Sequence, residues 1–91
     1  MYSNDLNKKE LEISLIEIWQ NTLIKNQIGI HDNFFELGGH SLLAIKIVSL
    51  IRQRHNCDLS VKELLLHPTI MLLSEYLLSK GKPEINAISG L

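Results

Sequence analysis

The chain has 91 residues, which leaves room for one small domain. Its 9 basic and 10 acidic residues give a formal net charge of −1 without a dense basic block, so the composition argues against a nucleic-acid partner. No apolar run is long enough for a signal-peptide core or a membrane span. Cys57 is the only cysteine, so no intramolecular disulfide can form, and we expect a cytoplasmic protein without a membrane partner.

The first helix is predicted to begin after Asn7 and to fade near residues 26–29. Asn7 and Glu10 have the spacing of a capping box, and Leu6 and Leu11 have that of a hydrophobic staple. Behind this start, residues suited to a core recur at steps of three and four and form one stripe. They are Leu11, Leu15, Ile18, Trp19, Thr22 and Leu23.

Residues 27–40 form a long loop in which turn-forming residues alternate with apolar ones. The turn formers are Gly29, Asp32, Asn33, Gly38 and Gly39. The apolar side chains that need burial are Ile28, Ile30, Phe34, Phe35 and Leu37. We therefore expect an ordered loop that lies over the core, and long ordered loops in small domains are often functional.

A second helix is predicted to begin at Ser41, or at a residue beside it, and to end at about His55. Two more helices follow it. Ser60 and Glu63 have the spacing of the capping box of a short third helix, which Pro68 ends. The staple of that helix is predicted at Leu59 and Leu64.

Thr69 is predicted to cap the fourth helix, and Gly81 to stop it, with Lys80 in its last turn. The sequence thus predicts an all-α four-helix bundle, with three main helices, one short helix and a long ordered loop between the first and second. We expect the domain to cover residues 7–81, with residues 1–6 and 82–91 as flanking linkers or tails.

The segment that indicates chemistry is the glycine pair that leads to Ser41 at the mouth of the second helix. Glycines allow close backbone approach, and a helix N-terminus favours a phosphate through its free N–H groups and its partial positive charge. Nothing activates Ser41 as a nucleophile, because the side chain of the adjacent His40 does not face it and no Gly-x-Ser-x-Gly elbow is present. Ser41 is thus better suited to being modified, the alternative being a plain N-cap.

The helical wheel of the second helix separates a core side from an exposed side. At about 100° per residue, Leu42 and Ile45 lie near Ser41, which indicates either partner contacts or chance exposure. The residues on the opposite, core-facing side are Leu43, Ile47, Leu50 and Ile51. Across the domain, the side chains that we expect to be buried include Trp19, Leu43, Ile47 and Leu77.

The run Phe-Glu-Leu-Gly-Gly-His-Ser-Leu-Leu-Ala at residues 35–44 resembles the core motif of peptidyl carrier (thiolation) domains of non-ribosomal peptide synthetases. Residues 32–35 and 68–70 resemble the same family, so the likeness covers roughly residues 10–80. It implies a 4′-phosphopantetheine arm, taken from coenzyme A and held on Ser41 by a phosphodiester. Gly39, His40 and Leu42 would complete the attachment site, and the chain would itself catalyse no step.

The resemblance also implies partners. A phosphopantetheinyl transferase would attach the arm, an adenylation domain would load its thiol, and condensation and thioesterase domains would draw from it. The candidate partner contacts are Leu42, Ile45, Phe35 and Leu37, and we expect the isolated domain to be monomeric.

Several alternatives stay open. His40 and the near-neutral charge favour the peptidyl class over acyl carriers of polyketide or fatty-acid type, many of which have aspartate before the serine. An unmodified helical interaction module is the main rival from another class, ahead of an enzyme or a helix-turn-helix DNA binder. The four histidines lack metal-ligand spacing, so no metal site is predicted.

Overall fold

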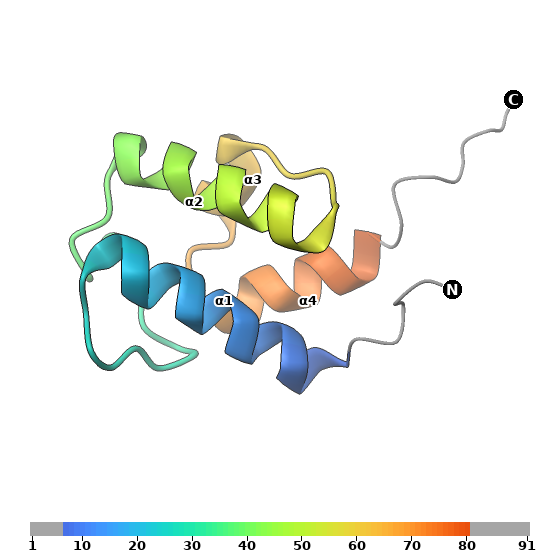
Figure 1. Ribbon diagram of the computed structural model, residues 1–91, viewed down its shortest axis with the longest axis horizontal. Helices are drawn as coiled ribbons and strands as arrows, with labels where there is room; N and C mark the ends of the chain where they lie inside the picture. Colours follow the sequence, from blue (N-terminus) through green and yellow to red (C-terminus); the bar gives the residue numbers. More distant parts are fainter. Residues whose placement is uncertain (1–6, 81–91) are drawn as a thin grey trace, which may run out of the picture.

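The computed structural model describes residues 7–80, which form four α-helices and no strand. The helices are α1 (Lys8–Leu23), α2 (Ser41–His55), α3 (Val61–Leu66) and α4 (Ile70–Lys80) (Figure 1). Helix α1 packs against both α2 and α4, and α3 packs against α2. The predicted all-α class, with three main helices and one short one, is confirmed. The flanking segments, Leu6 of the first staple and the stop at Gly81 lie outside the described residues.

The predicted helix starts are confirmed by their caps. Asn7 Oδ1 accepts from the N–H of Glu10 at 2.8 Å, and Glu10 Oε1 accepts from the N–H of Asn7 at 3.3 Å. The same reciprocal pair joins Ser60 and Glu63, at 3.1 and 2.8 Å. Thr69 Oγ1 accepts an N–H from the first turn of α4 at 3.1 Å. Local sequence signals therefore place the beginnings of α1, α3 and α4.

Helix α1 ends at Leu23, short of the predicted residues 26–29. It ends there because Ile24 turns into the left-handed conformation, with φ 57° and ψ 53°. Its N–H closes the helix end by donating to the carbonyl of Gln20. Glycine and asparagine are the usual residues at such a helix end, so a β-branched residue gives no sequence signal for it.

The core gathers side chains from all four helices and from the loop between α1 and α2. Trp19 and Ile47 are buried as predicted, and so are both staple residues of α3, Leu59 and Leu64. The loop contributes two further buried residues, Ile28 and Phe34. The remaining buried apolar residues are Leu11, Leu15, Ile18, Leu23, Ala44, Val48, Ile51, Ile70 and Leu73.

The predicted core face of α2 is confirmed at Ile47 and Ile51 and wrong at Leu43 and Leu50. The buried residues of the helix are Ala44, Ile47, Val48 and Ile51. Leu43 and Leu50 are only partly buried at the edge of this stripe. The reason is that α2 packs against α1 on one side and α3 on another, which brings Ala44 and Val48 into the core.

Leu77 is also only partly buried, contrary to prediction. The buried residues of α4 are Ile70, Leu73 and Ser74, in its first half. Leu77 lies in the last turns of the helix, where it packs on the edge of the core.

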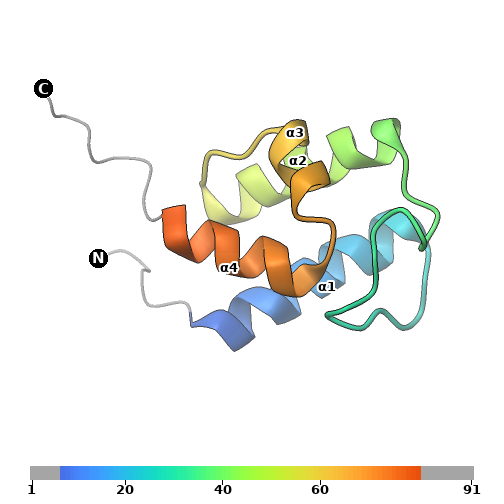
Figure 2. The same ribbon diagram turned by 180° about the vertical axis from the view of Figure 1, so that it is seen from behind.

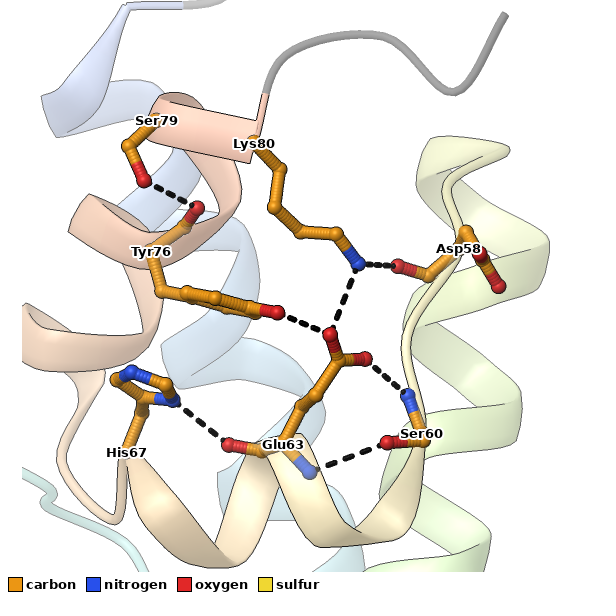
Figure 3. A network of polar contacts seen from close by, with 7 residues as sticks. All are labelled: Asp58, Ser60, Glu63, His67, Tyr76, Ser79 and Lys80. Carbon is orange, nitrogen blue, oxygen red and sulfur yellow. Dashed lines mark hydrogen bonds and ion pairs between the residues drawn. The ribbon is translucent and has the colours of Figure 1, made fainter.

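Polar side chains join α3 to α4 (Figure 3). The Glu63 carboxylate accepts hydrogen bonds from the Tyr76 hydroxyl and from Lys80 Nζ, the latter at 3.2 Å. Lys80 also donates to the carbonyl of Asp58, and the His67 ring stacks on Tyr76 with 4.2 Å between centroids. Burial alone would raise the pKa of Glu63, but the hydrogen bonds from Tyr76, from the α3 cap and from Lys80 outweigh it and lower that pKa to about 2.

Candidate functional site

The loop from residue 24 to residue 40 is attached to the connection between α3 and α4. The N–H of Phe34 donates to the carbonyl of Pro68 at 2.7 Å, and the N–H of Met71 donates to the carbonyl of Ile30 at 3.0 Å. Met71 lies in the first turn of α4, so this bond satisfies an N–H that has no acceptor within its own helix. Figure 2 shows the loop passing the start of α4 before it returns to α2. The predicted ordered loop over the core is thus confirmed.

Phe34 fixes the loop in the core, whereas Phe35 points outward. Phe34 is fully buried and meets the Trp19 ring edge-on, with 5.5 Å between centroids. Phe35 is 49% exposed, so the expectation that it needs burial is wrong, because the turn at residues 34–38 directs it away from the core. Leu37 is partly buried and packs against the core. A partner could therefore contact less of the Leu37 side chain than of the Phe35 side chain.

The glycine pair brings the chain back against Phe34. The N–H of Gly39 donates to the carbonyl of Phe34 at 2.9 Å. A Cβ at Gly39 would lie 2.5 Å from the Phe34 ring and 2.6 Å from that carbonyl oxygen, so no other residue fits without a backbone shift. Gly38 has φ +96°, a conformation that favours glycine. Together the two glycines determine where α2 starts.

Ser41 is the first residue of α2 and not its N-cap. The N-cap is His40, which is extended and makes no side-chain capping bond, so the N-cap alternative for Ser41 is wrong. The first helical bond runs from Ala44 to the carbonyl of His40 at 2.9 Å, which leaves the three preceding N–H groups without an acceptor in the helix. Ser41 is exposed, and within residues 7–80 no hydrogen bond involves its hydroxyl. An uncapped helix N-terminus with an exposed serine fits a covalently bound phosphate.

Two large apolar side chains are exposed beside Ser41, as predicted. Leu42 is 72% exposed, and Ile45, one turn further on the face of Ser41, is 53% exposed. Phe35 adds a third exposed apolar side chain from the loop. Ser41 is thus accompanied by apolar surface that the fold itself does not bury.

A serine–histidine pair does occur in the described part of the chain, but away from Ser41. Ser14 Oγ and His55 Nε2 lie 2.8 Å apart and join α1 to α2. Burial and the neighbouring Arg54 lower the pKa of His55, which favours its neutral form. This pair could not be predicted from the sequence, because its members are far apart in the chain and neither belongs to a motif.

Residues 7–80 contain no group of three or more His, Cys, Asp or Glu side chains that could hold a metal ion. None of the four helices combines the length and hydropathy that crossing a membrane requires.

The chain matches known proteins over most of its length. Residues 7–77 match the family described as phosphopantetheine attachment site. The chain is 44% identical to tyrocidine synthase 3 of Brevibacillus parabrevis over 81 residues (89% of this chain, 1% of that protein). It is 46% identical to gramicidin S synthase 2 of Brevibacillus brevis over 79 residues (87% and 2%). The chain thus spans only 1 to 2% of the length of these relatives.

Solved structures give the same result. One is the peptidyl carrier protein in complex with the phosphopantetheine transferase Sfp and coenzyme A (TM-score 0.72, 38% identity, 76% of this chain and 90% of that chain). Another is McyG A-PCP complexed with phenylalanyl-adenylate (TM-score 0.72, 35% identity, 75% and 11%). With the family match over residues 7–77, these likenesses confirm the resemblance in the Gly-Gly-His-Ser motif: the chain belongs to the phosphopantetheine attachment-site family, as a carrier domain of the peptidyl class.

Proposed function

We propose that Ser41 is the residue that holds the 4′-phosphopantetheine arm, and that the chain carries aminoacyl or peptidyl groups in non-ribosomal peptide synthesis. The observation that carries this proposal is the exposed serine at an uncapped helix N-terminus, separated only by His40 from a glycine pair that the fold requires. When bound, the arm supplies the thiol on which an acyl group is held as a thioester. The chain supplies the tether, which replaces free diffusion by a high local concentration.

The residues around Ser41 suit a phosphodiester. The free N–H groups of the first turn of α2 and the positive end of the helix dipole favour a negative charge at this place. No acidic residue occurs in that first turn, so no carboxylate repels the phosphate from within the helix. The contact of Gly39 with Phe34 holds the chain in place ahead of Ser41. Direct contact of the arm with Gly39, His40 or Leu42 stays a prediction.

The chain itself is proposed to catalyse no step. Within residues 7–80, no histidine or carboxylate hydrogen-bonds to the Ser41 hydroxyl, so nothing in this part of the domain prepares it for attack. The chemistry would belong to partner domains. Sfp and the A domain of McyG occur with carrier proteins similar to this chain, which supports a transferase and an adenylation domain as partners. Condensation and thioesterase domains are proposed from the synthetase class of the relatives.

Leu42, Ile45 and Phe35 are proposed as the apolar contacts for these partners, with Leu37 contributing less. Burial of one such side chain against a partner contributes only a small binding free energy. The partner can therefore dissociate quickly, as a carrier with several successive partners needs. The cytoplasmic location, the monomeric state, the domain limits at residues 7 and 81 and the absence of a nucleic-acid partner stay predictions from the sequence.

Intact-mass measurement after incubation with coenzyme A and Sfp tests the proposal. The parent chain is expected to gain one phosphopantetheine, and Ser41→Ala to gain none. Ser49→Ala is the matched control, since Ser49 is an exposed serine on the same helix, and it is expected to be modified like the parent. Modification that persists in Ser41→Ala would disprove the site, and an unmodified parent would favour the plain interaction module.

A further inference from the structure

The last turn of α2 is joined to α1 by a polar contact in which a titratable side chain takes part. Ser14 Oγ and His55 Nε2 lie 2.8 Å apart, and both residues are partly buried. Arg54 Nη1 lies 3.4 Å from the same serine oxygen and 3.2 Å from the carboxylate of Glu17. The attachment of this helix end to α1 therefore involves the protonation state of His55.

The neighbouring arginine determines how the serine and the histidine share their protons. The guanidinium of Arg54 can only donate, so Ser14 Oγ accepts from it. The Ser14 hydroxyl then has its own proton to donate to His55 Nε2, and that nitrogen can accept only when the imidazole is neutral. The arrangement thus fits a neutral His55 with its proton on Nδ1.

No carboxylate on the facing helix is available to a protonated His55. Within residues 7–80, no carboxylate oxygen lies within 4.0 Å of its ring nitrogens. On α1, Glu17 is paired with Arg54, and Glu10, one turn before Ser14, takes part in the capping box of its own helix. The positive charge of His55 would therefore lie beside the positive charge of Arg54 without a negative charge in contact.

The other elements at this end of the bundle add a positive charge and no free carboxylate. Lys80 of α4 donates to the carbonyl of Asp58, three residues beyond His55, and it also occupies the Glu63 carboxylate of α3. Burial and the charge of Arg54 lower the pKa of His55, in agreement with the geometry.

We propose that Ser14 and His55 form a pH-sensitive contact, which holds the last turn of α2 on α1 near neutral pH and releases it in mildly acidic solution. A proton taken up from solution binds to Nε2 of His55, so the Ser14 hydroxyl loses its acceptor. The new N–H of His55 and the N–H of Arg54 would then be directed at one serine oxygen, and two like charges would lie side by side. An unsatisfied, partly buried donor and this repulsion both oppose the closed arrangement.

The sign of the pH effect follows from the direction of the pKa change. In the unfolded chain His55 has the ordinary pKa of about 6.5, and in the folded chain its pKa is lower. The folded chain therefore binds fewer protons than the unfolded chain in this range. The contact contributes its full stability above about pH 6.5 and loses it as the pH falls through the lower, folded-state value.

The contact acts on the helix that begins with Ser41, but at its opposite end. Helix α2 has 15 residues, so at about 1.5 Å per residue His55 lies about 20 Å from Ser41 along the helix axis. Loss of the contact would change how the helix is held without altering the exposed serine. The proposal therefore does not rest on the proposed function, and attachment of the arm at neutral pH should not require His55.

Urea unfolding of the full chain at about pH 7.5 and about pH 5.5 tests the proposal, with His55→Gln as the variant. Glutamine keeps a side-chain oxygen that can accept from Ser14, but it does not titrate. His31→Gln is the matched control, because His31 is an exposed histidine of the loop whose ring forms no hydrogen bond within residues 7–80.

The equilibrium constant for unfolding of the parent should rise severalfold more over this pH interval than that of His55→Gln. One histidine with an unfolded pKa of about 6.5 can contribute at most about tenfold here. His31→Gln should show the same rise as the parent. An equal rise in the parent and in His55→Gln would overturn the proposal.

Proton NMR titration of the histidine Cε1–H signals follows His55 directly and does not depend on the folding of a His55 variant. The midpoint of His55 in the parent should lie below the ordinary histidine value. It should move upward in Ser14→Ala, because the neutral imidazole then loses its donor. A midpoint at the ordinary value in the parent, or one that does not move in Ser14→Ala, would contradict the proposal.

Amide hydrogen exchange shows whether the last turn of α2 is released. The protection factors of residues 53–55, corrected for the intrinsic effect of pH on exchange, should fall severalfold in the parent between about pH 7.5 and about pH 5.5. They should stay nearly constant in His55→Gln. Constant protection of these amides in the parent would show that the helix end is not released.

Discussion

At Gly39 the lack of a side chain decides where helix α2 begins. The backbone there lies against the ring and the carbonyl of Phe34, and Phe34 itself is fixed in the core by Trp19. Close contacts therefore join Trp19 to Phe34 and Phe34 to Gly39, which lies two residues before Ser41. The motif glycine has a packing role in addition to any contact with the arm.

Gly39→Ala should destabilise the domain by about 1–3 kcal/mol, because its Cβ would meet a backbone oxygen that cannot move away easily. Gly29→Ala is the matched control, since a Cβ at Gly29 would lie 3.5 Å from the flexible side chain of Asp32. Thermal unfolding followed by circular dichroism compares the two. Equal melting temperatures for both variants would show that the close approach is not needed.

Ile24 combines a costly backbone conformation with an exposed side chain. It is left-handed and 83% exposed, so its side chain gains little from burial. Helix α2 ends in the same conformation at Asn56, a residue type that tolerates it better. Ile24→Asn should therefore raise stability by about 1 kcal/mol, measured as a higher denaturant midpoint. Ile13→Asn, at an exposed isoleucine within α1, should not raise it, and a lower midpoint for Ile24→Asn would contradict the argument.

At the scale of elements, the short helix α3 depends on side chains for its attachment to α4. It has six residues and one buried side chain, Leu64. The Glu63 carboxylate supplies the link, through Tyr76 and Lys80 (Figure 3).

Glu63→Gln keeps a capping side chain but weakens the link, so we expect a loss of about 1–2 kcal/mol of stability. Glu10→Gln is the control, because Glu10 has the same place in the capping box of α1 without the link to α4. The pKa of Glu63 is lowered on folding, so its contribution is present above the unfolded value and is lost as the pH falls from about 5 to about 2. Urea unfolding across this range should show a smaller pH dependence in Glu63→Gln than in Glu10→Gln. Equal pH dependence in both would refute the role of the link.

Across the whole molecule, features set by residues close in the sequence could be predicted better than features that depend on packing between helices. The caps at Asn7, Ser60 and Thr69 are set by residues three apart, so they could be read from the sequence alone. The core face of α2 could not, because α3 adds a second neighbour that brings Ala44 and Val48 into the core.

Some features of the candidate site could likewise be predicted from the sequence, and others could not. Ser41 and the exposed Leu42 and Ile45 follow from the motif and from helix periodicity. The outward turn of Phe35 and the position of His40 as N-cap follow from the contact between Gly39 and Phe34, which joins a loop to the core. No spacing in the sequence encodes that contact.

Residue-level mass spectrometry can show directly whether the arm is attached at Ser41. The full chain is incubated with coenzyme A and Sfp, digested, and each serine-containing peptide is fragmented to locate the added group. We expect one phosphopantetheine per chain, on Ser41, with the other serines unmodified. Attachment at a different serine, or a chain that stays unmodified under conditions in which a known peptidyl carrier protein is fully converted, would contradict it.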